Sequence, residues 1–590
     1  METTVREVAP RGRIGRQGGS TALAVALFVV ATLLYTYPQP VALDSAPVHP
    51  DPFLSIWRLE WIAHVLTGGP GRLFHGNILY PARRPLTYSD ATLLEGLLAT
   101  PLLWLGVPGV IVYNVLVLGS FVFAGAAMFL LVRALTGSPQ AALVAGTVFA
   151  FAPLRLEHYM HLELLWSGWM PLTLYALHRT LATGRLRFGL LTGACLALQV
   201  FSSVYYGIFL AIVLPPIAAA SWALRVAPLT RQRVAALAAG AALTAAAVAP
   251  YAKEYIVTSG EIGTRSAEET RLYSATPLAY VSCPPMNWVC GWTFSRWGAN
   301  EKQLFPGLTA IALLVVALGS RSLGRERLCY AIALALAVDL SFGASGLTFQ
   351  SLGSIGSGLR APARAGMLVL ALVSVLAGYG VARLTRAQAT ARHARLTTSI
   401  ILCLLVIEYG HRPLALERLP TSRGPFEAWL RGQASGVVVH LPMPRPDRLP
   451  GAEPEFNLAS TFDWHPLVNG YSGFLPAAFL QLLQTMQTFP DPESIAALRQ
   501  RQVRWIAVHE DVYLGRRKML VGGVARHGWG REWGDHRAVS YDGVPLETLV
   551  DALATSPDIA WVGRFASVLG PVQVYELTGS PRTQPAATSF

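Results

Sequence analysis

Charged residues are scarce in this chain, and their scarcity decides its class. Asp, Glu, Lys and Arg make up 14% of the 590 residues, hydrophobic residues make up 53%, and the mean hydropathy is +0.41. Soluble globular domains carry about 25% charged residues, so the composition excludes a soluble enzyme. Apolar runs of the ~20 residues that cross a bilayer recur through residues 21–411. The chain is therefore predicted to be a polytopic membrane protein.

Nucleic-acid-binding motifs are also absent, although the net charge is +13. The arginines fall mainly between the apolar runs, where basic residues set the orientation of a membrane protein. The basic excess therefore indicates topology, and no nucleic acid is expected as a partner. A convincing small-residue cleavage site is missing, so residues 21–38 are predicted to remain as a membrane span behind a cytoplasmic tail at 1–20.

Cysteine is rare, with five in the chain. Cys283 and Cys290 lie together in a polar loop, and their spacing predicts a small disulfide if that loop is extracytoplasmic. Cys195, Cys329 and Cys403 lie within apolar spans and are expected to be inert packing residues.

The apolar runs predict eleven membrane-spanning helices and a cytoplasmic N-terminus. When the sides alternate, the five inner connections carry twelve arginines against one acid, Glu326, as the positive-inside rule requires. Residues 93–107 are also apolar, but Gly96 and Pro101 interrupt them and counting them as a span would put the arginines outside. They are predicted to be an interfacial or re-entrant segment. The predicted spans are 21–38, 110–132, 140–154, 163–178, 187–202, 204–224, 234–252, 305–320, 328–343, 365–383 and 397–411.

This topology leaves the remaining segments on the outer side. The first outer loop is long, at 39–109, and another spans 253–304. Strand-like runs at 436–441, 503–508 and 571–577, with a helical stretch at 476–487, predict an extracytoplasmic α/β domain over 412–578. The tail at 579–590 is rich in Ser, Thr and Pro and is predicted to be disordered. No internal repeat is evident, which weighs against an inverted-repeat transporter.

The stretch 49–64 directly follows the first span. Two prolines flank Asp51, which predicts a stiff turn rather than regular helix at this carboxylate. Apolar residues then recur with helical spacing and include Trp57 and Trp61, so a short helix lying in the headgroup layer is predicted. The alternative is a surface turn before an interfacial anchor. If the first interpretation holds, an acid stands at the boundary between water and lipid.

Ionisable residues gather near the predicted outer membrane surface. A site built there would reach a lipid-phosphate head group from the bilayer and a polar acceptor from water. Tyr205 and Tyr206 lie at the same level, where an aromatic belt is the alternative role. The ionisable residues are Asp51, Glu60, Glu157, His158, His161, Glu163, Glu254, Arg265, Arg360 and Arg364.

This arrangement resembles the C superfamily of polytopic glycosyltransferases (GT-C), which contains protein mannosyltransferases, aminoarabinose transferases and arabinosyltransferases. It is most similar to bacterial members of uncharacterised specificity. Many members carry two adjacent acids in the first loop, whereas Asp51 stands alone beside Pro52. The resemblance is carried by the first outer loop, the C-terminal outer domain and the stretches 49–52, 77–81, 151–158, 359–364 and 469–474.

The resemblance implies a GT-C-like fold and inverting transfer of a sugar from a polyprenyl-phosphate donor in a bacterial inner membrane. The acceptor would be a glycan, a lipid or a protein. Asp51 would be the general base, since an exposed aspartate with a pKa near ~3.9 is ionised at neutral pH. Arg360 and Arg364 would hold the departing phosphate. His158 and His161 would help to bind the phosphate, and the supporting residues would be Glu60, Glu157, Glu163, Glu254, Arg265, Tyr205 and Tyr206.

The two histidines leave alternatives open. His158 and His161 could hold a divalent metal, Mg²⁺ or Mn²⁺, together with Asp51, or hydrogen-bond the donor phosphate or the acceptor. They could also be polar residues that cap a span.

Two other functions compete with glycosyl transfer. A lipid or glycan transporter predicts charges near the membrane midplane and broken helices there, whereas the polar residues gather on one side. A non-catalytic scaffold for envelope assembly would leave Asp51 as a relic.

Overall fold

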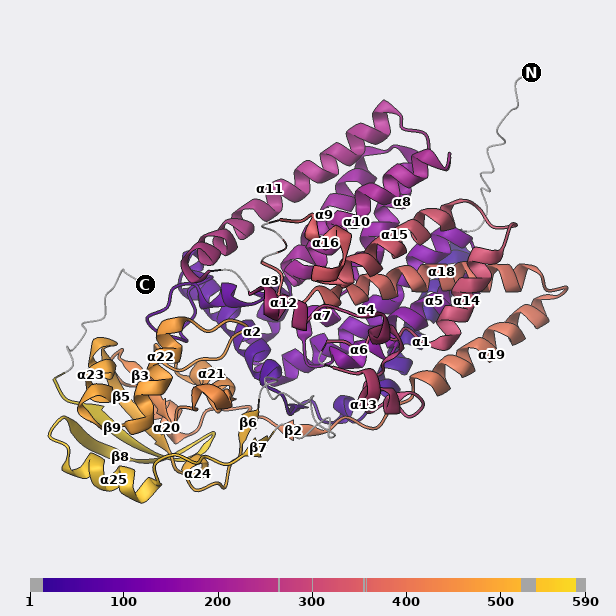
Figure 1. The fold of residues 1–590 in the computed structure, drawn as a ribbon. Coiled ribbons are helices and arrows are strands. Elements are labelled where there is room, and N and C mark those ends of the chain that lie inside the picture. The colour runs from indigo at the N-terminus through magenta and orange to yellow at the C-terminus, as the bar shows by residue number, and fades with distance from the viewer. Residues whose placement is uncertain are drawn as a thin grey trace.

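The computed structural model describes residues 14–263, 266–299, 301–353, 356, 358–521 and 537–579. A helical bundle runs from α1 (Ile14–Tyr35) to α19 (Ala391–Tyr409), and a C-terminal α/β domain lies against one end of it (Figure 1). The other long helices of the bundle are α4 (Gly109–Thr136), α5 (Pro139–Phe151), α8 (Trp169–Thr183), α9 (Leu186–Ser202), α10 (Val204–Ala223), α11 (Arg231–Ile262), α14 (Leu308–Gly319), α15 (Glu326–Ser341) and α18 (Gly366–Arg386).

Each of the eleven predicted spans overlaps one of these helices, although the span predicted at 163–178 begins before α8 and crosses a break at 166–168. Among the described residues, five helical segments are long and apolar enough to cross a membrane, and four shorter helices, α1, α3, α9 and α14, are also apolar. The chain is an integral membrane protein. The five longer segments are Gly109–Thr136, Pro139–Glu157, Val204–Ala223, Arg231–Ile262 and Pro362–Arg386.

The core of the bundle forms around α18, whose residues from Gly366 to Ala382 are all buried. Helices α5, α14 and α15 pack against it. By contrast, α11 is largely exposed and packs mainly against α9. That contact is close because glycines line it: a Cβ on Gly240 would lie 2.2 Å from the carbonyl oxygen of Gly189. A side chain there has no room.

Two helices fill the first outer loop: α2 (Pro50–Gly68) and α3 (Leu93–Trp104). Pro50 and Pro52 occupy the first turn of α2, where a missing N–H group costs no hydrogen bond. The prediction that this stretch is not helical was therefore wrong. The His49 side chain accepts a 3.2 Å hydrogen bond from the backbone N–H of Asp51 and caps the helix. The short helix α3 forms the segment predicted to be interfacial or re-entrant.

The aromatic residues of α2 contact protein instead of lying in the headgroup layer as predicted. Trp57 and Trp61 are 1% and 8% exposed, and the rings of Trp61 and Trp464 lie 5.8 Å apart. Helix α2 packs on α3 and on α21 (Glu453–Ala459) of the C-terminal domain. The prediction of a helix that floats in the interface was wrong because the C-terminal domain covers this face.

The C-terminal domain contains a four-stranded sheet in the order β3-β5-β9-β8. Strands β3 (Val437–Leu441) and β5 (Val503–His509) are parallel, and β9 (Gly570–Leu577) runs antiparallel to β5 and to the edge strand β8 (Ile559–Ser567). The three predicted strands are β3, β5 and β9. A smaller sheet joins β4 (Pro450–Gly451), β6 (Met519–Val521) and β7 (Arg537–Val539).

Helices surround these sheets, and α22 matches the predicted helical stretch. Residues 580–590 of the predicted disordered tail and residues 1–13 of the predicted cytoplasmic tail lie outside the described part of the chain. The helices of the domain, besides α21, are α20 (Pro425–Arg431), α22 (Ala477–Thr485), α23 (Pro492–Gln500), α24 (Glu510–Tyr513) and α25 (Leu546–Thr555). The short helices of the bundle are α6 (Leu154–Glu157), α7 (Leu162–Leu165), α12 (Ala267–Leu272), α13 (Phe294–Trp297) and α16 (Leu347–Gln350).

Backbone hydrogen bonds attach the C-terminal domain to the first outer loop. Strand β1 (Ser45–Pro47) pairs antiparallel with β2 (Leu416–Arg418). The N–H of Leu79 donates to the carbonyl of Asn469 at 2.9 Å, and the N–H of Leu467 donates to the carbonyl of Asn77 at 2.6 Å. The domain is therefore part of the same assembly as α2.

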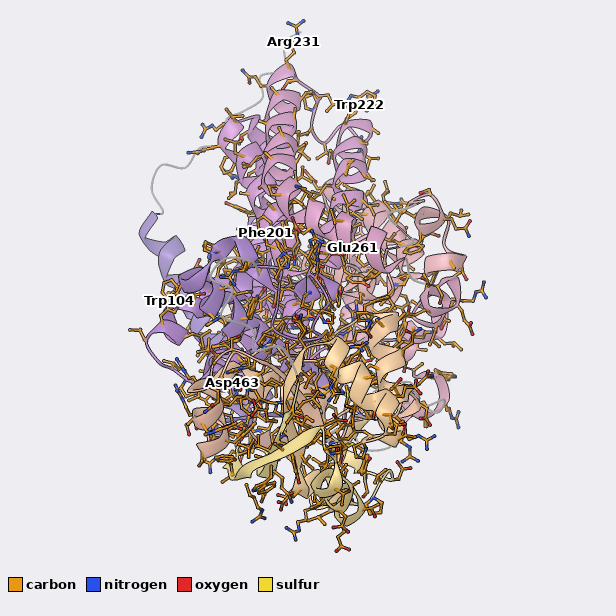
Figure 2. The ribbon with its side chains drawn as sticks, turned by 90° about the vertical axis from the view of Figure 1, so that its left-hand side faces the viewer. Trp104, Phe201, Trp222, Arg231, Glu261 and Asp463 are labelled. Atoms are coloured by element: carbon orange, nitrogen blue, oxygen red, sulfur yellow. A yellow bond between two sulfur atoms is a disulfide. The ribbon has the colours of Figure 1, made fainter. Side chains whose placement is uncertain are left out.

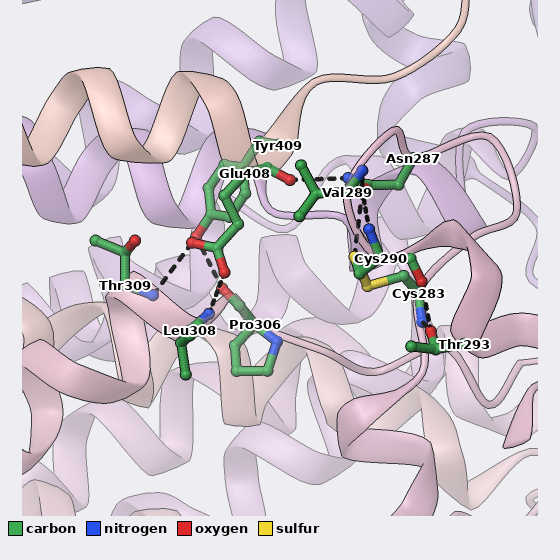
Figure 3. Close-up of a disulfide and its surroundings, with 10 residues drawn as sticks. All are labelled: Cys283, Asn287, Val289, Cys290, Thr293, Pro306, Leu308, Thr309, Glu408 and Tyr409. Carbon is green, nitrogen blue, oxygen red and sulfur yellow. Dashed lines mark hydrogen bonds between the residues drawn. A yellow bond between two sulfur atoms is a disulfide. The ribbon is translucent and has the colours of Figure 1, made fainter.

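The predicted disulfide between Cys283 and Cys290 is confirmed (Figure 3). It lies in the loop before α14, close to the C-terminal end of α19. The carboxylate of Glu408 on α19 accepts hydrogen bonds from the first backbone N–H groups of α14, including that of Thr309 at 3.1 Å. Disulfides persist in oxidising compartments, which suits an extracytoplasmic face.

The ends of the molecule differ in character. Arg231, at the start of α11, and Trp222, at the end of α10, lie at the end opposite the C-terminal domain, whose Asp463 is labelled in the same view (Figure 2). The arginine-rich connection at 225–233 is thus separated by the helices from the C-terminal domain. This separation agrees with the predicted arrangement of the two faces.

Candidate functional site

A cavity of about 600 Å³ opens where α2, the ends of α10 and α11, and the C-terminal domain meet. The residues that line the cavity come from the start of α2, from the segments 157–163 and 358–364, and from residues 471–475 of the C-terminal domain. The cavity collects seven predicted site residues from distant parts of the chain. They are Asp51, Glu157, His161, Glu163, Tyr205, Arg360 and Arg364.

Four of the predicted residues that the structure describes are not brought to the cavity. His158 and Tyr206 are buried outside its lining. Glu60 accepts a hydrogen bond from the backbone N–H of Gly109, outside the lining, and burial raises its pKa to about 7. Glu254 forms a 2.9 Å ion pair with Arg84 outside the lining. Arg265 lies outside the described residues.

Asp51 is held by three side chains from three segments. Its Oδ1 accepts a 2.9 Å hydrogen bond from the Tyr471 hydroxyl, and its Oδ2 lies 2.9 Å from His161 Nε2 and 3.4 Å from His49 Nδ1. The side chain is 20% exposed, so it is less accessible than the sequence predicted. A carboxylate has about four acceptor positions, which leaves room for a substrate hydroxyl.

The neighbours of Asp51 set its charge. Burial alone would raise the pKa of Asp51, but the electrostatic influence of His49 and His161 and the hydrogen bonds from His161 and Tyr471 hold it well below the usual range of an aspartate. Burial would likewise lower the pKa of His161, yet the Asp51 carboxylate outweighs burial and raises it. Asp51 is therefore ionised at neutral pH.

The two predicted phosphate ligands differ in how far they are already engaged. The guanidinium group of Arg364 forms two hydrogen bonds with the Glu301 carboxylate, at 2.7 and 2.6 Å, and both side chains are buried. Arg360 is 26% exposed, lies over the Tyr273 ring at 5.0 Å, and approaches Glu301 only to 4.0 Å. Arg360 is thus the more available cation.

Arg58 is a third cation of the cavity. It is 3% exposed, lines the cavity, and makes no hydrogen bond within the described part of the chain. Its nearest charged partner is Glu163, with 3.8 Å between Arg58 Nη1 and Glu163 Oε2. A buried guanidinium with unused donors is costly unless an anion reaches it. Arg58 is therefore an anion-binding candidate.

Two further acids line the wall beside Arg58. Asp90 caps α10 by accepting hydrogen bonds from the Val204 N–H at 2.8 Å and the Ser203 hydroxyl at 3.1 Å. Burial raises the pKa of Asp90 to about 6. Glu163 is 5% exposed, and its Oε2 has no hydrogen-bond partner among the described residues. These acids can accept hydrogen bonds from substrate hydroxyls.

The residues proposed for a metal do not form a ligand set. In the described part of the chain, no group of three or more His, Cys, Asp or Glu side chains is arranged to hold a metal ion. His158 is buried outside the cavity lining, and burial lowers its pKa to about 3. The other histidine near Asp51 is His49, whose Nδ1 already accepts a backbone hydrogen bond. No step below uses a metal.

Sequence reasoning did not name Arg58, Asp90, Glu301 or Tyr471 as site residues. Arg58 had a usable signal, because it stands seven residues after Asp51 on the same helix and so shares its face. Tyr471 lies in the stretch 469–474 that carries the family resemblance, but nothing in the sequence pairs it with Asp51. Glu301 reaches Arg364 across 63 residues of sequence, and Tyr471 reaches Asp51 across 420.

No known protein family and no curated protein matches this chain. Solved structures do. AglB, the oligosaccharyltransferase of Archaeoglobus fulgidus in complex with an inhibitory peptide and a dolichol-phosphate, is 11% identical with a TM-score of 0.45, covering 85% of this chain and 70% of that one. A second A. fulgidus oligosaccharyltransferase structure, tethered to an acceptor peptide with the NVT sequon, is 10% identical with a TM-score of 0.49 and the same coverage.

The apo structure of ArnT from Cupriavidus metallidurans is 14% identical with a TM-score of 0.47, covering 95% of this chain and 98% of that one. Because the TM-scores are below 0.5, the function proposed below is drawn from the cavity of this chain.

Proposed function

We propose that this protein is a membrane glycosyltransferase that moves a sugar from a polyprenyl-phosphate donor to an acceptor on the extracytoplasmic face, with inversion at the anomeric carbon. The observation that carries the proposal is the cavity itself. It places an ionised carboxylate, Asp51, beside two incompletely engaged guanidinium groups, Arg58 and Arg360. Glycosyl transfer from a lipid phosphate needs both a base and a phosphate site.

Asp51 is the proposed general base. The acceptor hydroxyl attacks the anomeric carbon from the face opposite the phosphate, Asp51 takes its proton, and the bond between the anomeric carbon and the phosphate oxygen breaks. The electron pair of that bond leaves with the phosphate. General-base catalysis of this kind contributes about 10²- to 10⁴-fold to the rate.

Arg58 and Arg360 are the proposed phosphate ligands. Guanidinium groups match phosphate oxygens with two parallel hydrogen bonds and stabilise the charge that develops on the leaving group. Arg364 is tied to Glu301 by two hydrogen bonds, so it is not available to a phosphate in this arrangement. Arg58 therefore replaces Arg364 as a proposed phosphate ligand.

The lipid part of the donor is proposed to leave the cavity between the ends of α10 and α11. Apolar lining residues there include Val204, Ile262 and Leu359. Helix α11 is largely exposed along its length, as expected for a helix facing lipid. A prenyl chain would pass from this gap into the bilayer without crossing polar protein.

The proposal is tested by native mass spectrometry of lipids that copurify with the protein in mild detergent. We expect wild type to retain polyprenyl phosphate or its glycoside, and Arg58→Gln to retain at least ten-fold less. The matched control is Arg445→Gln, which removes an exposed arginine of the C-terminal domain and should retain as much as wild type.

If wild type and Arg58→Gln both carry only bulk phospholipid, the donor assignment fails. A scaffold function then gains weight. If both retain equal polyprenyl phosphate, Arg58 is not its ligand.

A further inference from the structure

The side chain that holds Asp51 Oδ1 comes from the C-terminal domain. Tyr471 lies in the loop 469–474, which enters the cavity from above, and its hydroxyl donates to Asp51 at 2.9 Å. No other described side chain forms a hydrogen bond with this oxygen. The other carboxylate oxygen of Asp51, Oδ2, lies 2.9 Å from Nε2 of His161, a residue of the helical bundle. The carboxylate is thus fixed from two domains.

Three consecutive residues of the loop, from Asn469 to Tyr471, are held by hydrogen bonds. The side-chain amide of Asn469 accepts a hydrogen bond from the His440 N–H at 2.6 Å and donates one to the His440 carbonyl at 3.0 Å. The Gly470 N–H donates to Glu453 at 2.6 Å. The N–H of Tyr471 donates to the side-chain amide oxygen of Asn457 at 3.2 Å, and the Asn457 amide nitrogen donates to the Tyr471 carbonyl at 2.9 Å. This network leaves the tyrosine little freedom to move.

The loop 469–474 also packs directly against the segment around Leu79 in the predicted first outer loop. The Leu79 N–H donates to Asn469, and a Cβ on Gly470 would lie 2.5 Å from Leu79 Cγ. Only glycine permits this approach. The position of Tyr471 is therefore set relative to the same outer loop that carries Asp51, which is what a precise hydrogen bond between two domains requires.

We propose that Tyr471 is a positioning residue of the transferase: its hydroxyl fixes the Asp51 carboxylate in the orientation that accepts the proton, so the C-terminal domain completes the catalytic site. This inference rests on the proposed function of Asp51. A hydrogen bond to an ionised carboxylate also favours the ionised form. Loss of the tyrosine hydroxyl therefore frees Asp51 to rotate and makes it easier to protonate.

Several other groups act on Asp51 and stay in place when the hydroxyl is removed. They are His49 at the start of α2 and His161 between α6 and α7. Arg58 lines the same cavity. The change expected from Tyr471 alone is therefore partial, and Asp51 stays ionised at neutral pH.

The test compares Tyr471→Phe with wild type in the full-length protein. The phenylalanine keeps the ring and its packing. The control is Tyr80→Phe, which removes a tyrosine hydroxyl that bonds Gln502 at the same junction of loop and domain but outside the cavity. Three quantities are measured: kcat and KM for transfer, retained polyprenyl phosphate, and the carboxylate stretching bands of Asp51 at neutral pH, whose frequencies report its hydrogen bonding. The last uses infrared spectra of ¹³C-aspartate-labelled protein, with Asp51→Asn to identify the bands.

We expect Tyr471→Phe to lower kcat about ten-fold or more, with donor retention unchanged and the Asp51 carboxylate bands shifted. Tyr80→Phe should change none of these. If Tyr471→Phe matches Tyr80→Phe in both kcat and the Asp51 bands, the inference is overturned. If wild type shows no transfer at all, the proposed function fails, and the Asp51 bands alone decide whether Tyr471 holds this carboxylate.

Discussion

Asp51 and Arg58 lie two turns apart on α2 and face one cavity. This pairing places the proposed base and the proposed phosphate ligand on one rigid element, so their separation is set by helix geometry. The loop residues His161 and Tyr471 contact the two oxygens of the Asp51 carboxylate. At the scale of single residues, the site combines one helix with contacts from loops far away in sequence.

The pair of Asp51 and His161 makes stability depend on pH. The pKa of His161 is raised in the folded protein, so its stabilisation is fully present below about pH 6.5, its ordinary pKa, and is lost as the pH rises through the folded value. The pKa of Asp51 is lowered, so its stabilisation is present above about pH 3.9 and is lost as the pH falls through the folded value.

We therefore expect the melting temperature of wild type to exceed that of His161→Gln most between about pH 4 and pH 6.5, with the difference narrowing above this window. This difference in melting temperature is measured by thermal unfolding of both proteins in detergent across about pH 4 to pH 9. The control is His75→Gln, since burial and nearby arginines lower the pKa of His75 and its contribution should not fade as the pH rises. A difference that is constant with pH would contradict the ion pair.

At the scale of elements, hydropathy predicts where most helices of the bundle lie. The predictions that failed, the environment of α2 and the strand β8, depend on how distant elements pack together. All eleven predicted spans overlap helices, as expected for apolar runs, which can satisfy their backbone in a membrane only as helices or closed barrels. The face of α2 was predicted to meet lipid because its tryptophans resemble an interfacial belt; nothing local reveals that Trp464 of a distant domain covers them. The edge strand β8 was missed because side chains exposed along much of its length give no clear alternation.

The contact between α9 and α11 gives a prediction at this scale. Gly240→Ala would place a Cβ 2.2 Å from a backbone carbonyl, which cannot move without separating the helices. We expect a loss of about 1–3 kcal/mol, measured as a lower melting temperature in lipid nanodiscs.

Gly119→Ala on α4 is the matched control, because a Cβ there meets nothing within 4 Å. It should be neutral or stabilising by up to about 1 kcal/mol, since alanine favours helix over glycine. Equal melting temperatures for the two variants would show that the helices are not held as closely as described.

At the scale of the whole molecule, the C-terminal domain is part of the site. It pairs strand β2 with β1, covers α2, and supplies Tyr471 to Asp51. The sequence predicted the domain and its class but not this contact, because the pairing of residues 420 positions apart leaves no local pattern. The sequence also does not reveal that the guanidinium group of Arg364 is hydrogen-bonded to Glu301. This ion pair is the reason why Arg58 replaces Arg364 as a proposed phosphate ligand.

The most direct test of the account is release of polyprenyl phosphate by the purified protein. Wild type, Asp51→Asn and the exposed control Asp447→Asn are reconstituted with a lipid extract from the host membranes, and free polyprenyl phosphate is followed by mass spectrometry. We predict release by wild type and by Asp447→Asn, and about 10²- to 10⁴-fold slower release by Asp51→Asn. Equal release by Asp51→Asn, or none by wild type, would contradict the claim that this cavity transfers sugar from a lipid phosphate.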